Sequence, residues 1–376
     1  MWVVRILIWL AITGSFHYYV WRRIVRETEM SPRVRRIVTI VMIAMWLLVP
    51  ITTWSRLWWP AFGHVMGWIT LPWLAFVGLA TVALLALELP RRVAHRSSNL
   101  GVTRREFLAR VTGGTAAVVA GSSVAGGIAS ARGEHEVVDV EVRLARLPRA
   151  LDGFTIVQLS DLHTGLTIDR AFVQRVVDHA NGLAPDLIAL TGDLVDGPVA
   201  DLREDIAPLA SLRARHGVFA VTGNHEYYAG ADAWIAEITR LGARYLRNER
   251  VTIAPGLELA GVDDYGADKY EGHGEDLPRA TAGRDPSAAL VLLAHQPRQV
   301  KKAAQHGVDL QLSGHTHGGQ IWPWHYIVKL QQGGLLAGHY DHAGTQLYVT
   351  RGCGYWGPPV RLLAPLEITR IILRAA

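Results

Sequence analysis

The first third of the chain consists of long apolar stretches separated by polar, arginine-rich segments. Three stretches, residues 2–21, 37–59 and 65–89, approach the roughly 20 residues that a helix needs to cross the hydrocarbon core of a bilayer. Tryptophans such as Trp21 and Trp59 lie near their ends, as in the aromatic belts of membrane proteins. The pattern predicts three transmembrane helices. Buried helices of a soluble domain are the alternative.

The distribution of arginine predicts how these helices are oriented. Arginines cluster after the first stretch and again after the third, whereas the connection between the second and third stretches carries only Arg56. By the positive-inside rule, we expect the N-terminus outside the cytoplasm and the segment after the third stretch inside it.

A fourth, weakly apolar segment follows at Val111–Ile128. It comes after Thr103-Arg104-Arg105-Glu106-Phe107-Leu108 and ends in Ala129-Ser130-Ala131, so it resembles a twin-arginine export signal, although such signals normally stand at the N-terminus. If the segment spans the membrane, everything after it lies outside the cytoplasm. We therefore predict an extracytoplasmic C-terminal domain in a multi-pass protein of the cell membrane. A cytoplasmic Gly/Ala linker is the alternative.

From Glu136 onward, short strand-like apolar runs alternate with helix-like stretches. Strands are predicted at Phe154–Leu159, Leu187–Leu190 and Gly217–Val221, with helices at Arg170–Asn181 and Leu202–Arg215 between them. Three repeats of strand, polar tip and helix predict an α/β fold with a largely parallel sheet and functional groups at the carboxyl ends of its strands. Further strands are predicted at residues 257–262, 288–293, 308–312, 346–350 and 367–373, with a polar surface insertion at 263–284.

Charge divides the chain in a similar way. Residues 1–133 contain 15 Arg and 4 Glu, a net charge of +11, and residues 134–376 carry −6, which together give the formal charge of +5. The basic character therefore belongs to the apolar third, and the acidic remainder predicts no nucleic-acid partner. We divide the chain into a membrane region, 1–133, and a soluble domain, 134–376. Cys353 is the only cysteine, so an intramolecular disulfide cannot form.

Side chains that bind metals stand at the ends of the predicted strands. His315 and His317 occupy alternate positions among glycines, and imidazole is the commonest side-chain ligand for borderline metals. Alternate residues at a strand end point the same way, so both rings can face one site. Other strand ends carry Asp161, His163, Asp193, Asn224 and His295. A Ser-His-Asp hydrolase would need Gly-x-Ser-x-Gly, which the sequence lacks.

These blocks occur in a specific order: Asp-x-His, Gly-Asp, Gly-Asn-His-Glu, His and Gly-His-x-His. Over about residues 150–370 the order resembles the calcineurin-like metallophosphoesterase family. The resemblance implies a four-layer α/β/β/α sandwich around two divalent metal ions, here preceded by an N-terminal transmembrane helical region. It implies that Asp193 bridges the two ions. The remaining ligands would be Asp161, His163 and His317 for one ion, and Asn224, His295 and His315 for the other.

The residue types are consistent with this chemistry. Mixed nitrogen and oxygen ligands without thiolate favour Mn, Fe or Zn over Mg or Ca. Paired cations can generate hydroxide at neutral pH, so we predict in-line attack of metal-bound hydroxide on a phosphoester or pyrophosphate. By the resemblance, His225 is catalytic: it stabilises the phosphoryl charge and protonates the leaving oxygen. Many family members have Asp after this histidine, whereas here Glu226 follows, which leaves the partner that orients His225 open.

The predicted substrate rests on a finer resemblance. The membrane-anchored start and the closing segments Thr350–Gly352 and Pro365–Ile368 resemble bacterial enzymes grouped with UDP-2,3-diacylglucosamine hydrolases, which predicts a lipid-linked or cell-envelope phosphoester. One alternative is that the enzyme acts on a soluble phosphoester. The other is that the chain is a catalytically silent metal-binding membrane protein. Five aromatic residues either pack in the core or form an apolar rim for an acyl or prenyl chain: Trp322, Trp324, Tyr326, Tyr355 and Trp356.

Overall fold

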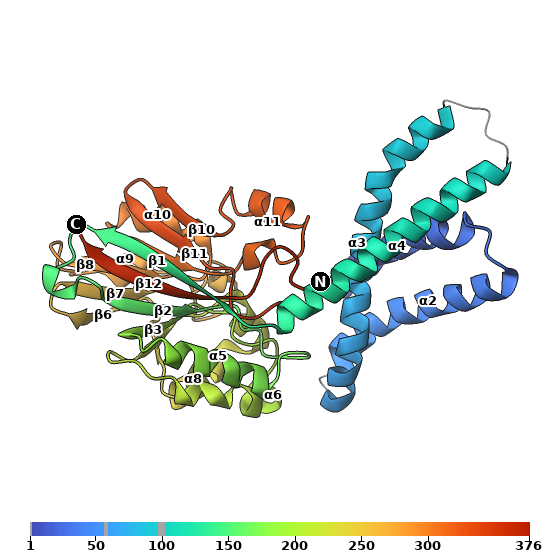
Figure 1. Cartoon of the computed structure of the whole chain (residues 1–376). Helices are drawn as coiled ribbons and strands as arrows, with labels where there is room; N and C mark the ends of the chain where they lie inside the picture. Colours follow the sequence, from blue (N-terminus) through green and yellow to red (C-terminus); the bar gives the residue numbers. More distant parts are fainter. Residues whose placement is uncertain (1, 56–58, 97–101) are drawn as a thin grey trace. The chain divides into compact units, whose positions relative to one another are not determined.

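The computed structural model describes residues 2–55, 59–96 and 102–376, and the chain divides into two compact units (Figure 1). The first, the helical unit, comprises the chain up to Ala129 together with Gly357–Val360. The second, the sandwich unit, comprises Ser130–Trp356 and Arg361–Ala376.

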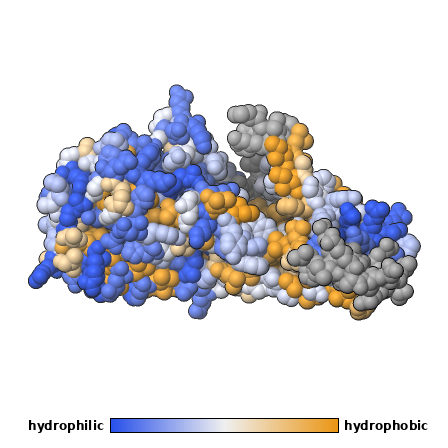
Figure 2. All heavy atoms as spheres, turned by 90° about the horizontal axis from the view of Figure 1, so that it is seen from above, coloured by the Kyte–Doolittle hydropathy of each residue, from blue (hydrophilic) through white to orange (hydrophobic). Residues whose placement is uncertain are grey.

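The helical unit contains long helices whose bounds are α1 Trp2–Trp21, α2 Pro32–Ser55, α3 Pro60–Arg96 and α4 Val102–Arg132, with a π-helical turn η1 at Arg22–Arg26. Among the described residues, three segments are long and apolar enough to cross a membrane: Pro32–Ser55, Ala61–Glu88 and Glu106–Arg132. The first two overlap the predicted stretches 37–59 and 65–89, and the last contains the fourth apolar segment. Figure 2 shows hydrophobic residues on the surface of this unit, whereas hydrophilic residues predominate on the visible face of the sandwich unit. These properties support membrane association.

Parts of the sequence prediction fall on residues outside this description. The predicted stretch 37–59 runs past the end of α2 into residues 56–58, Arg56 and Trp58 included, which lie outside the described residues. The backbone of Arg104 and Arg105 belongs to α4, but their side chains, which carry the export-signal resemblance, lie outside the described part. The fourth apolar segment is helical throughout and forms part of α4.

Polar side chains connect the helices of the helical unit. The indole N–H of Trp46 donates to Thr13 Oγ1 at 3.1 Å, and that of Trp73 donates to His17 Nε2 at 3.0 Å. Polar groups that are removed from water without a partner are costly, so these bonds allow α1 to pack against α2 and α3.

The sandwich unit is built on two six-stranded sheets. The first sheet has the order β1 Glu136–Leu144, β12 Glu367–Ala375, β2 Thr155–Leu159, β3 Leu187–Leu190, β4 Val218–Ala220, β5 Arg244–Tyr245. The second has the order β10 Gly338–His342, β11 Thr345–Val349, β9 Leu310–Ser313, β8 Ala289–Leu293, β7 Leu257–Gly261, β6 Glu249–Ala254. In the first sheet β12 and β2 are antiparallel and the other neighbours are parallel.

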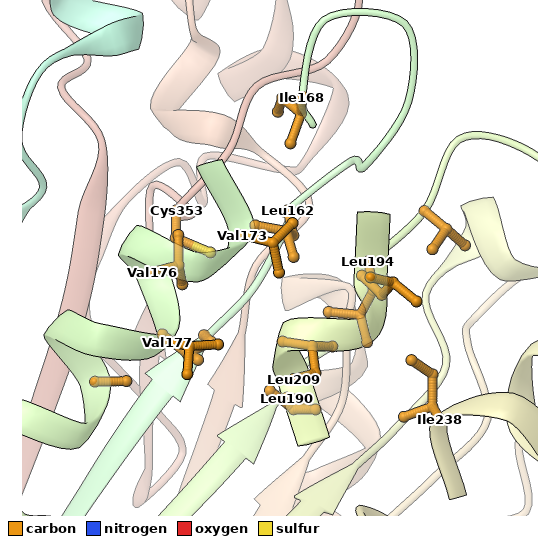
Figure 3. Close-up of a cluster of buried hydrophobic side chains, with 14 of the residues drawn as sticks. Leu162, Ile168, Val173, Val176, Val177, Leu190, Leu194, Leu209, Ile238 and Cys353 are labelled. Carbon is orange, nitrogen blue, oxygen red and sulfur yellow. The ribbon is translucent and has the colours of Figure 1, made fainter. Parts of the chain in front are cut away.

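Apolar side chains fill three spaces and so define four layers. One cluster lies between the sheets and includes Ile156, Leu259 and Leu312. A second joins the first sheet to α5 Arg170–Gly182, α6 Val199–Ile206 and α8 Ala231–Arg240; Figure 3 shows Val173, Val176 and Val177 of α5 in this cluster together with Leu190 and Leu194. A third joins β7 and β8 to α9 Leu277–Thr281 and α10 Val300–Gln305. Full burial of each such side chain contributes about 1.5–3 kcal/mol. The predicted α/β/β/α sandwich is confirmed.

Two local predictions differ from the structure. The helix predicted over Leu202–Arg215 begins earlier and ends at Ile206, where a 3₁₀ turn, Ala207–Ser211, containing Pro208 replaces it. Proline has no N–H for an α-helical hydrogen bond, which explains the change. The segment 263–284 is not entirely a surface insertion, because Asp263 and Asp264 at its start are buried.

Candidate metal centre

The seven predicted metal ligands lie directly after strands, in loops that belong to both sheets. Asp161 and His163 follow β2, Asp193 follows β3, and Asn224 begins α7 Asn224–Ala229 shortly after β4. In the second sheet, His295 follows β8, and His315 and His317 follow β9. Because these strands end at the same edge of the sandwich, side chains distant in sequence meet there.

The backbone of these loops is unusual. Five of the seven residues adopt left-handed φ angles: Asp161 (56°), His163 (51°), Asp193 (52°), His315 (72°) and His317 (53°). Such conformations cost non-glycine residues of order 1–3 kcal/mol each and persist where the surrounding structure imposes them, often at functional sites. Here they turn side chains of short loops toward one another.

Two glycines allow the loops to approach closely. A Cβ atom at Gly223 would lie 2.2 Å from Asp193 Oδ1, and one at Gly314 would lie 2.1 Å from Asp161 Oδ2. Both distances are far below van der Waals contact, so any larger residue would displace a carboxylate of the site.

Three groups among the described residues have metal-ligand spacing, and one of them joins His225 to His163 and Asp193. The other two consist of predicted ligands alone. The Asp161 cluster consists of Asp161, His163 and His317, and the Asp193 cluster consists of Asp193, His295 and His315; in each, one ligand atom per residue lies within 4.8 Å of the others. The Nε2 atoms of His163 and His317 are 3.1 Å apart. His295 Nε2 lies 3.2 Å from His315 Nδ1.

Asp193 stands between the two clusters. Its Oδ2 atom lies 3.1 Å from His295 Nε2 and 3.8 Å from His163 Nε2, while its Oδ1 accepts a hydrogen bond from the backbone N–H of His225 at 2.8 Å. One carboxylate oxygen therefore faces the imidazoles of both groups. This is the position that a bridging ligand requires.

The donor set fits divalent cations. The Oδ1 atom of Asn224 is buried and accepts no hydrogen bond, so this amide oxygen is left for a metal ion to bind. Asp161 is fully buried, and burial raises the pKa of its carboxyl group, which means that its ionised form needs a positive charge nearby. Facing imidazole nitrogens about 3 Å apart also require a proton or a cation between their lone pairs. These residues can hold metal ions.

His225, the predicted catalytic histidine, is oriented by Asp196. Asp196 Oδ1 lies 2.7 Å from His225 Nδ1 and 2.7 Å from His163 Nδ1. Burial opposes protonation of His225, but the charges of Asp193 and Asp196 outweigh it and raise its pKa to about 9. Burial also opposes ionisation of Asp196, but the charges of His163 and His225 prevail and lower its pKa well below the usual range.

Glu226, which follows His225, binds the backbone of two neighbouring loops. It is buried, and its carboxylate accepts from the backbone N–H groups of Asp193, Leu194 and Gly223 at 2.6–3.0 Å. It thereby ties the Asp193 loop to the loop of His225. The residue that orients His225, which the sequence left open, is Asp196. Its only clue in the sequence is its position in the strand-end loop, three residues after Asp193.

Arg361 is a second residue that the sequence did not indicate. It is 1% exposed and donates to the carbonyl oxygens of His317, Arg351 and Gly354, and its Nη2 lies 3.2 Å from His317 Nδ1. Burial lowers the pKa of Arg361 to about 10. Nothing in the Pro-Pro-Val-Arg sequence signals that this arginine is buried beneath a candidate metal ligand.

Of the five aromatic residues expected either in the core or in an apolar rim, some are buried and others are exposed. Tyr355 is a core residue, because it is 2% exposed and its hydroxyl donates to the carbonyl oxygen of Thr167. Trp324 is half-buried. Trp322, Tyr326 and Trp356 are exposed, and the Trp356 ring lies 6.0 Å from that of His225.

Comparisons with known proteins agree with this geometry. Residues 154–319 match the family model for the calcineurin-like phosphoesterase. The chain is 33% identical over 291 residues to the uncharacterized metallophosphoesterase YkuE of Bacillus subtilis, covering 73% of this chain and 98% of that protein. It is 37% identical over 261 residues to a transmembrane protein with metallophosphoesterase domain from Danio rerio, and the match covers 66% of this chain and 60% of that protein. It is 40% identical over 240 residues to an uncharacterized metallophosphoesterase from Helicobacter pylori, and the match covers 63% of this chain and 64% of that protein. The chain thus spans less than two thirds of the length of the last two relatives.

Proposed function

Because the chain belongs to the calcineurin-like phosphoesterase family, we propose that it is a membrane-anchored, metal-dependent phosphohydrolase that cleaves a phosphoester or pyrophosphate bond. The observation that carries the proposal is the position of Asp193 between two clusters of metal-ligand side chains. In our assignment Asp161, His163 and His317 would hold one divalent ion, Asn224, His295 and His315 would hold the other, and Asp193 would be shared. The absence of thiolate favours Mn, Fe or Zn.

The residues of the chain have distinct tasks in this proposal. Bound cations would supply Lewis-acid activation of the phosphoryl group and of water. His225, protonated at neutral pH because two carboxylates raise its pKa, would stabilise the anionic phosphoryl oxygens and give its proton to the leaving oxygen. Asp196 would hold the ring through Nδ1, which leaves Nε2 as the atom that donates to substrate.

For the membrane, we propose a multi-pass region over residues 1–133 and a catalytic domain over 134–376 outside the cytoplasm. The three apolar segments and the transmembrane relative from Danio rerio support the anchoring. The arginine distribution and the twin-arginine-like segment support the orientation. A phosphatase reporter fused after Ala376 should be active, and a reporter that works only in the cytoplasm should be silent. The reverse result would refute the orientation.

A lipid-linked or cell-envelope phosphoester remains our proposed substrate, since a bilayer would present such molecules to the tethered domain. The full-length protein, purified in detergent, should contain divalent metal by elemental analysis and hydrolyse a generic aryl phosphate monoester or diester. Metal without hydrolysis would favour a silent metal-binding protein. A screen of lipid extracts against soluble phosphoesters, read as released phosphate, then decides the substrate class.

A further inference from the structure

Large apolar side chains project from the surface of the sandwich unit beside the candidate metal centre. We call this group the docking face; its members and exposed fractions are Trp322 (44%), Tyr326 (64%), Ile327 (54%), Leu330 (83%), Trp356 (57%) and Leu363 (82%). Single exposed apolar residues are common in soluble proteins, but contiguous groups mark interaction surfaces.

Hydrogen bonds join the segments of the docking face into one surface. The N–H of Trp322 donates to the carbonyl oxygen of Leu362 at 3.1 Å. The side-chain amide of Gln320 donates to the carbonyl oxygen of Trp356 at 2.8 Å and accepts from its N–H at 2.9 Å. Between these segments lies α11 His325–Gln331, a helix whose residues are all described and none of which is buried. Tyr326, Ile327 and Leu330 are therefore exposed on α11, although His325 at the start of the helix packs against Gly319.

The charge of these segments is compatible with the negative surface of a bilayer. The sequence contains no Asp or Glu from Gly318 to Tyr340 or from Gly352 to Leu366, and Lys329 is the exposed cation among them. Carboxylates are costly to bring against the negative surface of a bilayer, whereas aromatic residues and lysine are typical of its interfacial zone. The segment 263–276, by contrast, carries six acidic residues.

The docking face is continuous with the candidate metal centre. The turn Gly318–Gly319 links His317 to the docking face, and it packs so closely that a Cβ atom at Gly319 would lie 2.3 Å from His325 Cα. On the other side, the ring of Trp356 lies 6.0 Å from the ring of His225. Anything that covers the docking face is therefore adjacent to the predicted catalytic histidine.

We propose that the docking face inserts into the interfacial zone of a phospholipid bilayer and so holds the candidate metal centre at the level of lipid phosphates. This inference rests on the proposed membrane anchoring, because the apolar helices of the same chain would keep a bilayer within reach. It adds a second, peripheral contact through the sandwich unit itself. A site in this position reaches phosphoryl groups at the membrane surface without extraction of the lipid.

The test measures lipid contact directly in the full-length protein. The native Cys353 is buried and burial raises its pKa to about 12, so it should not react with a maleimide dye. Leu330→Cys and Leu363→Cys, labelled with an environment-sensitive fluorophore, report from the docking face. Ser287→Cys is the matched control, because it is exposed and precedes β8, whose other end carries His295.

In nanodiscs of phosphatidylcholine and phosphatidylglycerol, doxyl-labelled lipids should quench the dyes at positions 330 and 363 but not at 287. Equal quenching at all three positions would overturn the proposal. So would dyes at 330 and 363 that are shielded from water but not quenched by lipid, because a second copy of the chain or a protein partner would then cover the docking face.

Hydrolysis provides an independent readout. Leu330→Ser combined with Leu363→Ser should lose lipid quenching at a dye attached through Ile327→Cys and lose activity on a phosphoester lipid in nanodiscs, while hydrolysis of a soluble aryl phosphate stays unchanged. If the double variant hydrolyses the phosphoester lipid and the aryl phosphate as well as the unaltered protein does, the docking role is contradicted. If the dyes are quenched by lipid but no phosphoester is cleaved, docking stands and the proposed phosphohydrolase function fails.

Discussion

The Asp161 cluster and the Asp193 cluster use the same kinds of ligand but differ in what supports them. In the Asp161 cluster, His163 Nδ1 contacts the carboxylate of Asp196 and His317 Nδ1 faces the guanidinium of Arg361. In the Asp193 cluster, His295 Nδ1 lies 2.8 Å from the backbone carbonyl oxygen of Thr191, a neutral partner. Charged partners tune the basicity of an imidazole more strongly than a carbonyl group does. The two proposed metal positions should therefore differ in affinity.

The clusters also differ in their connection to the predicted catalytic histidine. Asp196 contacts both His163 and His225, so a carboxylate joins a ligand of the Asp161 cluster to the His225 ring. Asp193 accepts a hydrogen bond from the backbone N–H of His225 and acts on its ring through charge, which raises the ring's pKa. A change at His163 should therefore disturb the hydrogen-bond partner that orients the His225 ring, whereas a change at His295 should leave that partner in place.

The largest effect is expected where the clusters meet. Asp193→Ala removes the carboxylate oxygen that faces the imidazoles of both groups, so metal content and hydrolysis should both fall to background. Elemental analysis and an aryl phosphate assay measure this, with circular dichroism to establish that the variant is folded. A folded Asp193→Ala protein with normal metal content would disprove the bridging role.

His225→Ala should separate chemistry from metal binding. Loss of a general acid lowers the turnover number by about 10²- to 10⁴-fold, while metal content should stay normal because His225 is not a proposed ligand. His342→Ala, an exposed histidine on β10, is the matched control and should behave like the unaltered protein. Full activity of His225→Ala would exclude the assigned mechanism.

Removing one histidine from each cluster should make the two metal positions distinguishable. His317→Ala should empty the Asp161 position preferentially, and His315→Ala should empty the Asp193 position, so each variant should lose about half of the bound metal. Titration of the metal-free protein measures this stoichiometry. If either substitution abolishes binding at both positions, the clusters are not independent sites.

A smaller effect is expected from Arg361, which would act as a positioning residue. Arg361→Met keeps bulk but removes the hydrogen bonds to the loop of His317, so affinity at the Asp161 position should fall by about 10- to 100-fold. Arg361→Lys should recover part of that loss because it restores a buried donor. Calorimetric metal titration should show the second position unchanged; equal weakening at both would point to a general loss of structure.

Much of the sandwich was predictable because hydrophobic periodicity is a local property. The strands at β2, β3 and β8 were located from short apolar runs followed by polar tips, and the seven proposed ligands were named from their residue types and order. The strands β5, β6 and β10 were not predicted, because they lack a comparable apolar run. The helix ends at Ile206 because Pro208, a single residue within an otherwise helical pattern, follows it.

The sequence by itself determined which residue types stand at the ends of strands, since composition and periodicity need no knowledge of distant contacts. Only the tertiary structure decided which of them touch. Asp196 and Arg361 lie 33 and 44 residues from the histidines that they support, and their burial depends on how separate loops pack together. The same holds for the docking face, because the sequence alone does not distinguish a buried aromatic residue such as Tyr355 from an exposed one such as Trp356. Burial is a property of the whole fold, and it separates a structural side chain from a functional one.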